Sequence, residues 1–236
     1  MEFTSDQRKA FDLALGGENL FVTGGAGTGK TFLLQKVIQT LARLGKQVVI
    51  CAPTGTAAIK VGGVTINRVF SLLAGPCINE KSMSLTVHCP ATIKKADVVI
   101  IDEMSMCRMD MMDSIQKSIE KAEKQTKRHI QVIVVGDFFQ LPPVINEDRG
   151  ERTLLEKYYK RPIGRGYAFT GDGWNKFGFT SVALTQIVRQ KDREFVEQLN
   201  KSRFGDTSSL DYFNSKVQHH LLADAVFLFG HHTTVN

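Results

Sequence analysis

Residues 24–31, with the sequence GGAGTGKT, limit the possible folds of this chain more than any other stretch. The apolar residues before it, Leu20 to Val22, predict a short strand. The residues after it are apolar at positions 33, 34, 37, 38 and 41, the spacing of an amphipathic helix. A glycine turn before a helix is the simpler interpretation, but strand, loop and helix occur in the order that the pattern G-x-x-x-x-G-K-[ST] requires. We therefore predict an α/β fold of the P-loop NTPase class, in which this loop binds a nucleotide.

Each residue type in the loop has a physical reason to be there. Glycines let backbone N–H groups curl around phosphate oxygens, and the dipole of the following helix favours the same negative charge. The Lys30 ammonium would neutralise the β- and γ-phosphates, and the Thr31 hydroxyl would hold Mg²⁺. The predicted nucleotide-binding residues of the loop are Gly25, Ala26, Gly27, Thr28, Gly29, Lys30 and Thr31.

A second apolar run, in ADVVIIDEMSM at residues 96–106, ends in two carboxylates. We predict that Asp102 completes the Mg²⁺ site with Thr31, and that Glu103 orients and deprotonates an attacking water. The alternative is that these acidic residues cap the following helix. The first interpretation predicts hydrolysis of the nucleotide as well as binding.

A third apolar run, QVIVV at residues 131–135, is followed by GDFFQLPPV. A continuous β-branched run is typical of a parallel strand that is covered on both faces. In a parallel sheet the carboxyl ends of the strands before Gly24, Asp102 and Asp137 line one edge, where open α/β sheets bind ligands. Gln140 would then reach the γ-phosphate and sense hydrolysis, and the stiff Pro142 and Pro143 would report the nucleotide state to a part that moves.

Composition and charge exclude several other classes of protein. With 42% hydrophobic and 23% charged residues over 236 positions, the chain is globular rather than disordered. No apolar stretch approaches the ~20 residues that span a bilayer, and the N-terminus lacks a signal peptide's apolar region. The four cysteines form no CxxC pair, which argues against a disulfide framework or a zinc site, and the net charge of +6 permits an anionic partner such as nucleic acid. We expect a location in the cytoplasm of a prokaryote or virus, or in the nucleus or mitochondrion of a eukaryote.

A series of motifs along the chain resembles that of one family. The motifs are FTSDQRKAF, GGAGTGKT, CAPTGTAA, GVTINRVFSL, IIDEMSM, GDFFQLPPV, AFTGDGWNKFGF around the single Trp, and LTQIVRQ. They cover nearly the whole chain and are similar to those of the petite integration frequency (Pif-type) DNA helicases, RecD-related members of helicase superfamily 1. The resemblance implies a RecA-like parallel sheet with helices on both faces. It also implies ATP and Mg²⁺ as cofactors, and 5′ to 3′ movement on single-stranded DNA that unwinds forked or structured DNA.

The resemblance also implies roles for two residues outside the loop. Gln7 matches the residue that reads the adenine edge, which would make ATP the preferred nucleotide; the alternative is an exposed Gln in the first turn of a capped helix. Arg189 matches an arginine that reaches the γ-phosphate from a second RecA-like domain; the alternative is a surface Arg at a strand end. The predicted catalytic residues are therefore Lys30, Asp102, Glu103, Gln140 and Arg189.

Single-stranded DNA is expected across the top of the RecA-like domains, held by backbone contacts and base stacking. Three residues follow the strand QVVIC, where hydroxyls and helix N-terminal amides can hold phosphates: Pro53, Thr54 and Thr56. Three more match positions that the family uses near the DNA: Thr65, Asn67 and Phe70. Relatives commonly carry His in place of Asn67, so only a hydrogen bond is expected there. Phe70 either stacks on a base or packs in the core.

The predicted organisation is a first RecA-like domain at residues 1–178 and the beginning of a second at 179–236. SVALTQIV would be the first strand of the second domain, and AVFLFG, residues 225–230, a later one. Residues 71–95 interrupt the α/β rhythm, and the family places a small strand-separating wedge there; a long surface loop is the alternative. The later motifs of the second domain are absent, so we expect weak or no unwinding by this chain alone.

Two functions of other classes stay open from the sequence. A P-loop ATPase that remodels proteins would keep Lys30 and Glu103 but would show no stimulation by single-stranded DNA. A nucleic-acid-binding module with an incomplete nucleotide site would bind DNA without turnover. The basic segment KYYKRPIGR, residues 157–165, either faces nucleic acid or is an exposed connector. No dimerisation heptad is present, and we expect a monomer.

Overall fold

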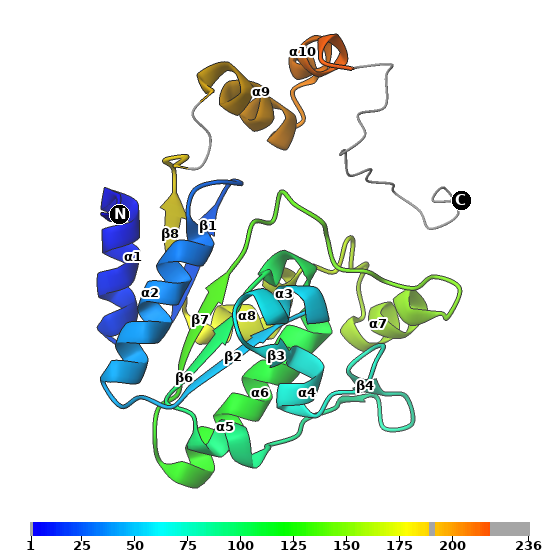
Figure 1. The fold of residues 1–236 in the computed structure, drawn as a ribbon. Helices are drawn as coiled ribbons and strands as arrows, with labels where there is room; N and C mark the ends of the chain where they lie inside the picture. The colour runs from blue at the N-terminus through cyan, green and yellow to red at the C-terminus, as the bar shows by residue number, and fades with distance from the viewer. Residues whose placement is uncertain (1, 189–191, 218–236) are drawn as a thin grey trace. The chain divides into compact units, whose positions relative to one another are not determined.

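Six parallel strands form the central sheet (Figure 1). A computed structural model describes residues 2–188 and 192–217. The strands lie in the order β3-β2-β6-β7-β1-β8, and every neighbouring pair runs parallel. Their bounds are β1 Leu20–Gly24, β2 Val48–Ala52, β3 Val64–Thr65, β6 Val98–Ile101, β7 Gln131–Val135 and β8 Thr180–Leu184. The predicted parallel α/β fold is therefore confirmed, and the three apolar runs of the sequence are neighbouring strands.

Helices cover both faces of this sheet, as Figure 1 shows. One face carries α1 (Ser5–Leu15) and α2 (Lys30–Arg43), and the other carries α4 (Ile66–Phe70), α5 (Ala91–Lys95), α6 (Met109–Thr126) and α8 (Asp172–Phe177). Alternate residues of one strand join opposite layers of the core. In β6, Val98 and Ile100 pack in the layer with α1 and α2, whereas Val99 and Ile101 pack in the layer with α6. This double coverage explains why the central strands are apolar at every position.

The carboxyl ends of the central strands lie close together. The N–H group of Gly136, just after β7, donates to the carbonyl of Val22 in β1 over 3.1 Å. A Cβ atom at Gly136 would lie only 2.8 Å from the backbone nitrogen of Met104, which follows β6. Glycine at this position therefore lets the turn after β6 cross closely over the end of β7.

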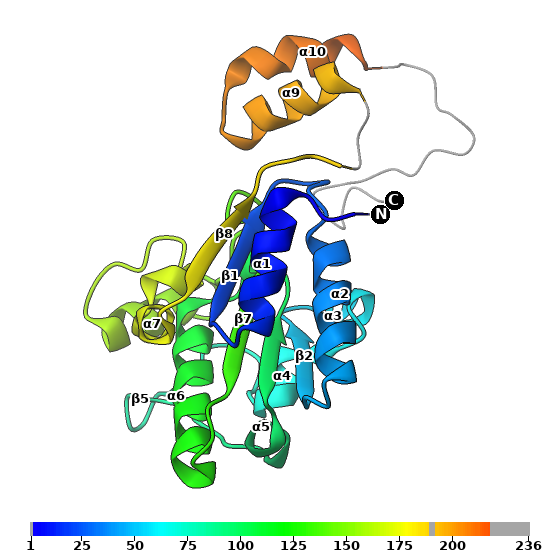
Figure 2. The same cartoon turned by 90° about the vertical axis from the view of Figure 1, so that its left-hand side faces the viewer.

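The strand at residues 180–184 belongs to the first sheet and not to a second domain. β8 pairs in parallel with β1 along its whole length, from Leu20 opposite Thr180 to Gly24 opposite Leu184 (Figure 2). Val182 and Leu184 are buried in the same core layer as α1. The prediction that SVALTQIV begins a second domain is therefore wrong, and the first compact unit runs to Lys191 rather than ending at residue 178. The physical reason is that β8 satisfies the backbone groups on the outer edge of β1.

The second compact unit begins at Asp192. Its described part contains α9 (Arg193–Arg203), a 3₁₀ turn (Thr207–Ser209) and α10 (Leu210–Ser215). The rings of Phe195 and Phe213 meet edge to face, with 6.3 Å between their centroids, which joins the two helices. The second RecA-like domain stays a prediction, because the expected strand at residues 225–230 lies outside the described residues.

Residues 71–95 contain regular structure rather than one long loop. Two short strands, β4 (Ile78–Asn79) and β5 (Ser84–Leu85), pair antiparallel as a hairpin. The segment then returns to the main core through α5, where Ile93 is fully buried. The hairpin also packs on the domain, because Ile78 of β4 is buried with Met109 and Leu155. Its role as a wedge stays a prediction.

Two further helices lie after strands of the sheet. α3 (Gly55–Lys60) follows β2, and α7 (Glu151–Tyr159) follows the GDFFQLPPV segment. Short 3₁₀ turns occur at Met104–Met106 and Ala168–Thr170. Within residues 2–188 and 192–217, no helix has both the length and the apolar character needed to cross a membrane.

Candidate functional site

The phosphate loop joins the end of β1 to the start of α2. Its last glycine, Gly29, is the N-cap of α2 and has a φ angle of 82°, a left-handed conformation that favours glycine. The Nζ atom of Lys30 donates to the carbonyl oxygens of Gly24, over 2.7 Å, and Gly25, over 3.1 Å. The Thr28 hydroxyl donates to the same Gly25 carbonyl over 3.0 Å. These bonds hold the loop in a curl, with its own lysine folded over it.

Two loop positions are open to solvent. Ala26 lies in the middle of the curl and Thr31 lies in the first turn of α2, and both are exposed. Gly27, which lies between Ala26 and Thr31 in the sequence, is half-buried. The Thr31 hydroxyl is thus accessible at a helix N-terminus, where the dipole favours an anionic ligand.

Gln7 ties helix α1 to the phosphate loop. Its Nε2 atom donates to the carbonyl of Thr28 over 2.9 Å, while its Oε1 atom accepts from the backbone N–H of Thr4 over 3.1 Å. The Thr4 hydroxyl accepts from the Gln7 backbone N–H in return, so the pair forms a capping box. Gln7 is 2% exposed, which excludes the exposed-cap alternative. Its reading of adenine stays a prediction, and its placement against the loop is compatible with it.

The segment after β8 also contacts the phosphate loop, which the sequence analysis did not anticipate. The backbone N–H of Val188 donates to the carbonyl of Gly27 over 2.9 Å. Upstream in the same segment, the hydroxyl and backbone N–H of Thr185 donate to one Asp6 carboxylate oxygen, over 2.7 Å and 3.0 Å. The hydroxyl bond is the main reason why the pKa of Asp6 lies below its usual value. The loop is therefore held from two sides, by α1 and by residues 185–188.

Asp102 and Glu103 follow β6, and one strand, β7, separates β6 from β1 in the sheet. The pKa of Asp102 is raised to about 6, mainly by burial and in smaller part by the neighbouring Glu103 carboxylate. The Lys30 ammonium partly opposes this rise, which places its charge within electrostatic reach of Asp102. Glu103 itself has a φ angle of 52°, an uncommon left-handed conformation for a residue with a side chain. Backbone strain of this kind often accompanies a functional site.

The residues present fit a Mg²⁺ ion. A hydroxyl from Thr31 and a carboxylate from Asp102 are oxygen donors of the kind that Mg²⁺ takes, together with water and nucleotide phosphates. The raised pKa of Asp102 shows a desolvated carboxylate with too little positive charge beside it. A divalent cation would supply that charge.

The turn after β7 presents Gln140 at the same edge. Asp137, 1% exposed, accepts from the backbone N–H of Phe139 over 3.2 Å and from the Gln140 Nε2 atom over 3.2 Å. Asp137 therefore shapes the turn, and Gln140 is the exposed member of the pair. Its sensing of the γ-phosphate stays a prediction.

Two of the predicted DNA-binding threonines begin helices. The Thr54 hydroxyl accepts from the Ala57 backbone N–H at the start of α3, and the Thr65 hydroxyl accepts from the Arg68 backbone N–H at the start of α4, each over 3.3 Å. Thr56 lies exposed in the first turn of α3, and Pro53 is half-buried before it. β2 and β3 are neighbours in the sheet, so these residues lie at adjacent positions of the same edge.

The other two predicted DNA-binding residues are engaged inside the protein. Phe70 is 1% exposed and packs in the core layer with α6, so the base-stacking interpretation is wrong and the core interpretation holds. The Asn67 Nδ2 atom donates to the carbonyls of Leu72, over 3.3 Å, and Leu73, over 2.9 Å. Asn67 therefore closes the end of α4, and contact with DNA would use what remains of its half-buried amide.

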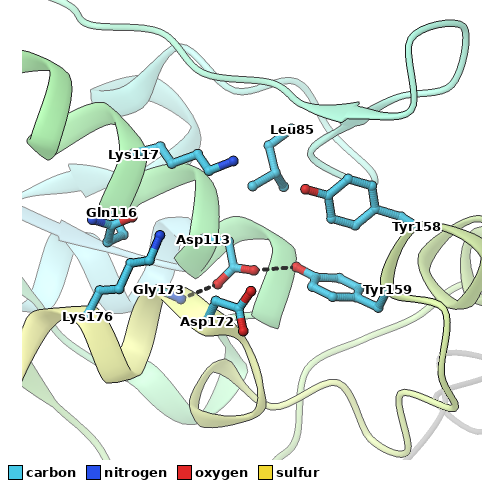
Figure 3. A pocket seen from close by; sticks show the side chains of 9 residues that line it. All are labelled: Leu85, Asp113, Gln116, Lys117, Tyr158, Tyr159, Asp172, Gly173 and Lys176. Atoms are coloured by element: carbon cyan, nitrogen blue, oxygen red, sulfur yellow. Dashed lines mark hydrogen bonds between the residues drawn. The ribbon is translucent and has the colours of Figure 1, made fainter.

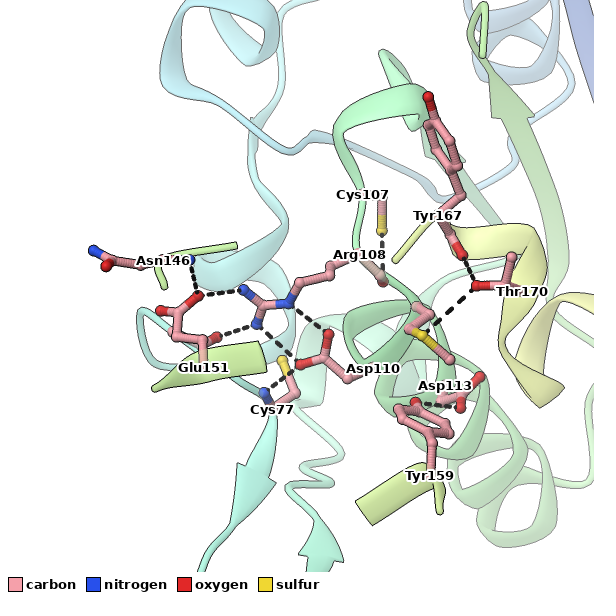
Figure 4. A network of polar contacts seen from close by, with 12 residues as sticks. Cys77, Cys107, Arg108, Asp110, Asp113, Asn146, Glu151, Tyr159, Tyr167 and Thr170 are labelled. Carbon is pink, nitrogen blue, oxygen red and sulfur yellow. Dashed lines mark hydrogen bonds and ion pairs between the residues drawn. The ribbon is translucent and has the colours of Figure 1, made fainter. Parts of the chain in front are cut away.

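A buried network around Arg108 was also missed by the sequence analysis (Figure 4). The Arg108 guanidinium contacts both oxygens of Asp110, over 2.6 Å and 3.0 Å, and Glu151 over 3.3 Å. It also donates to the carbonyl of Gly75 over 2.6 Å, while Asp110 accepts from the Cys77 backbone N–H over 2.6 Å. Arg108 thus joins the segment after Glu103 to the beginning of the hairpin insertion. The sequence signal was an arginine and an aspartate two positions apart, Arg108 and Asp110, inside a Met-rich run.

The structure brings most of the predicted nucleotide site together. Lys30, Thr31, Asp102, Glu103 and Gln140 all follow the carboxyl ends of neighbouring strands. Arg189 lies outside the described residues, two positions before the last residue of the first compact unit.

Comparison with known proteins gives one consistent family. The profile described as PIF1-like helicase matches residues 2–210. Among curated proteins, the chain is 31% identical over 210 residues to the ATP-dependent DNA helicase Pif1 of Campylobacter jejuni, a match that covers 84% of this chain and 44% of that protein.

Solved structures show the same relationship. The crystal structure of Bacteroides Pif1 bound to ssDNA matches with a TM-score of 0.78 and 32% identity, over 95% of this chain and 52% of that one. A structure of DNA unwinding at forked dsDNA by two coordinating Pif1 helicases matches with a TM-score of 0.76 and 32% identity, over 94% and 53% of the two chains. The fold is therefore the RecA-like P-loop fold of these proteins. The chain spans about half the length of the relatives it matches.

Proposed function

Because this chain belongs to the PIF1-like helicase family, we propose that it carries the ATP-hydrolysing sheet of an ATP-dependent DNA helicase. The observation that carries this proposal is the alignment of three parts at one sheet edge. The phosphate loop follows β1, Asp102 and Glu103 follow β6, and Gln140 follows β7, which lies between the other two strands. A P-loop with no carboxylates beside it would support nucleotide binding alone. In this proposal, Asp102 and Glu103 at the same edge support hydrolysis as well.

Each residue of the edge takes one step of the reaction. The loop N–H groups and Lys30 bind the β- and γ-phosphates, and the lysine exchanges its bonds to the Gly24 and Gly25 carbonyls for phosphate oxygens. Thr31 and Asp102 would hold Mg²⁺, which would neutralise charge on the phosphates. Glu103 orients a water for attack on the γ-phosphorus and takes its proton.

Gln7, Gln140 and Arg189 connect the reaction to movement in this proposal. Gln7 reads adenine from a position already fixed against Thr28. Gln140 contacts the γ-phosphate and changes partner when the phosphate leaves, and Arg189 stabilises the transition-state charge. The bond from Val188 to Gly27 holds the residue that precedes Arg189 in the sequence against the phosphate loop.

We propose single-stranded DNA as the polymer that this edge binds. The relatives support it, because one solved match is bound to ssDNA and another concerns forked dsDNA. Thr54, Thr56 and Thr65 offer hydroxyls at helix starts, and a hydroxyl that accepts a cap bond still has a proton to donate to a phosphate. Movement is 5′ to 3′, and unwinding by this chain alone is weak or absent because it corresponds to about half of a motor.

The proposal is tested by steady-state ATP hydrolysis with and without single-stranded DNA. We expect turnover that DNA stimulates, and we expect Lys30→Ala and Glu103→Gln each to abolish it. Lys46→Ala is the matched control, because Lys46 is exposed at the opposite edge of the sheet, before β2. Nucleotide binding should survive Glu103→Gln and fail in Lys30→Ala.

Two other results would replace the proposal. Turnover that DNA does not stimulate, together with no DNA binding, would favour an ATPase that acts on proteins. DNA binding without turnover in the unmutated chain would favour a nucleic-acid-binding module whose catalytic cleft is incomplete.

A further inference from the structure

A polar pocket of about 340 Å³ lies away from the nucleotide edge, between α6, the end of α7, the start of α8 and the hairpin strand β5 (Figure 3). Its walls include Leu85, Asp113, Lys117, Tyr158, Asp172 and Lys176. None of these residues belongs to the phosphate loop or to the turns that carry Asp102 and Gln140. The proposed function therefore leaves this pocket without a role.

The floor of the pocket is rigid. The Asp113 carboxylate accepts from the Tyr159 hydroxyl over 2.7 Å and from the Gly173 backbone N–H over 2.6 Å. A Cβ atom at Gly173 would lie 2.9 Å from the Cα atom of Asp113, so α8 is pressed against α6 here. Both Asp113 oxygens are thus occupied inside the protein, and this buried carboxylate is not available to a ligand.

Two ammonium groups stand at the mouth of the pocket. Lys117 on α6 and Lys176 on α8 are exposed, and neither forms an ion pair with any described residue. Figure 3 shows the Lys117 side chain extending toward Leu85 and the Lys176 side chain extending toward Gln116. The Glu120 carboxylate lies within electrostatic reach of Lys176. Two ammonium groups on neighbouring helices still offer donors to a phosphate group.

The opposite wall is aromatic and apolar. Tyr158 is half-buried and held edge to face against Tyr159, with 4.9 Å between ring centroids and an interplanar angle of 90°. Leu85, in the hairpin, closes the wall next to the Tyr158 ring (Figure 3). The exposed Asp172 carboxylate lines the same pocket, next to Asp113 (Figure 3), and can accept a hydrogen bond. An aromatic wall beside a phosphate-attracting pair is the arrangement that binds single-stranded nucleic acid.

We propose that this pocket binds one nucleotide of a single DNA strand, with its phosphate on Lys117 and Lys176 and its base between Tyr158 and Leu85. A volume near the lower limit of ligand pockets admits one nucleotide and not several. Asp172 accepts from an exocyclic amino group, so the pocket takes cytosine, adenine or guanine in preference to thymine, which has no such donor. The proposal rests on the proposed function, because the hairpin that supplies Leu85 is the predicted wedge, and it adds a DNA contact on the flank of the domain.

The charge contribution is tested with the double variant Lys117→Gln, Lys176→Gln. Binding of oligodeoxycytidine is measured by fluorescence anisotropy at several salt concentrations. Loss of the cations at this one phosphate should reduce the slope of log affinity against log salt by about 0.7, since each neutralised phosphate contributes about 0.7 for single strands. The matched control is Lys46→Gln, Lys95→Gln, which removes the same charge from exposed positions before β2 and β6 and should leave the slope unchanged.

The base contact is tested at two residues. Tyr158→Leu should weaken oligodeoxycytidine binding by about fivefold to about a hundredfold, the range for one stacked base, and Tyr158→Phe should keep it. The unmutated chain should prefer oligodeoxycytidine to oligodeoxythymidine, and Asp172→Asn should reduce that preference. Free deoxycytidine monophosphate, measured by calorimetry, is the probe for a small-molecule site.

Several results would overturn the pocket proposal. Equal slopes in the two double variants would contradict the phosphate contact. No preference between the two oligonucleotides would contradict the base contact. Pocket variants that weaken deoxycytidine monophosphate binding but not DNA binding would make it a free-nucleotide site. If DNA still stimulates ATP turnover while the pocket variants bind DNA normally, this proposal alone fails; if the unmutated chain binds no DNA, both proposals fail.

Discussion

Arg108 lies at the centre of a buried ion-pair network that its position in the sequence does not predict. Its side chain is 8% exposed, and that of Asp110 is 0% exposed, so their ion pair lies out of reach of water. Glu151 extends the network by accepting from the Asn146 backbone N–H over 2.9 Å. Three segments therefore meet at one guanidinium: the one after Glu103, the hairpin insertion, and the start of α7.

We expect Arg108→Met to lower the free energy of unfolding by about 3 to 5 kcal/mol, because it leaves two buried carboxylates without a cation. Arg152→Met is the control, since Arg152 pairs with Glu147 at the surface and its loss should cost less than about 1 kcal/mol. Urea denaturation of the two variants measures the difference. Similar losses in both would mean that the buried network carries no special weight.

Asp102 makes the stability depend on pH in the absence of metal. Its pKa is about 6 in the folded chain, above the ~3.9 of an unfolded Asp. Between these values the folded state holds a proton that the unfolded state has lost, so the free energy of unfolding falls as pH rises from about 4 to above about 6. The loss is at most about 3 kcal/mol.

This dependence is measured by urea denaturation at several pH values in buffer with a chelator. Asp102→Asn should remove that part of the pH dependence, and Mg²⁺ with ATP should restore stability to the unmutated chain near neutral pH. An unchanged pH profile in Asp102→Asn would show that burial does not perturb this carboxyl.

At the scale of single elements, the short helices after β2 and β3 depend on threonine caps. We expect Thr54→Ala to lower the free energy of unfolding by about 1 kcal/mol, because the Ala57 N–H loses its acceptor, and Thr54→Ser to retain it. Thr56→Ala should leave stability unchanged, because Thr56 caps nothing and is exposed. Thermal denaturation and DNA binding of the three variants separate the cap from a phosphate contact. If Thr56→Ala unfolds the chain as readily as Thr54→Ala, that assignment fails.

The elements also show which parts of the fold were predictable from the sequence. The phosphate loop and the strands before Asp102 and Asp137 were predictable because their signals are local: glycine spacing, and β-branched runs that end in polar residues. The pairing of β8 with β1 was not, since a strand pattern does not name its partner and Thr180 lies far along the chain from Leu20.

The residues of the candidate site were likewise predictable from the sequence only in part. The order of the motifs indicated that Lys30 and Asp102 would lie together. Phe70 was left between two roles, because an aromatic residue in a short helix has the same pattern whether it faces DNA or the core. Contacts such as Val188 with Gly27, or Arg108 with Gly75, depend on segments brought together only by the fold.

At the scale of the whole molecule, the boundary of the first compact unit decides which fragment is stable. A chain ending at residue 178 lacks β8, so β1 becomes an edge strand and the pocket filled by Val182 and Leu184 opens to water. Each buried apolar side chain of this size contributes about 1.5 to 3 kcal/mol. A chain ending at residue 191 keeps β8 with its buried Val182 and Leu184. It also keeps the bonds of Thr185 to Asp6 and of Val188 to Gly27.

We therefore expect residues 1–191 to unfold cooperatively and to bind a fluorescent ATP analogue. We expect residues 1–178 to be unfolded or aggregated and to bind it at least tenfold more weakly, since one side of the phosphate loop is no longer held. Circular dichroism during heating and a nucleotide titration measure both. If residues 1–178 fold and bind the ATP analogue as well as residues 1–191, β8 is dispensable. The first domain would then end at residue 178, as the sequence predicted. If residues 1–191 fold but hydrolyse ATP far more slowly than the full chain, the residues after Lys191 contribute to catalysis, as expected of a cleft that closes between two domains.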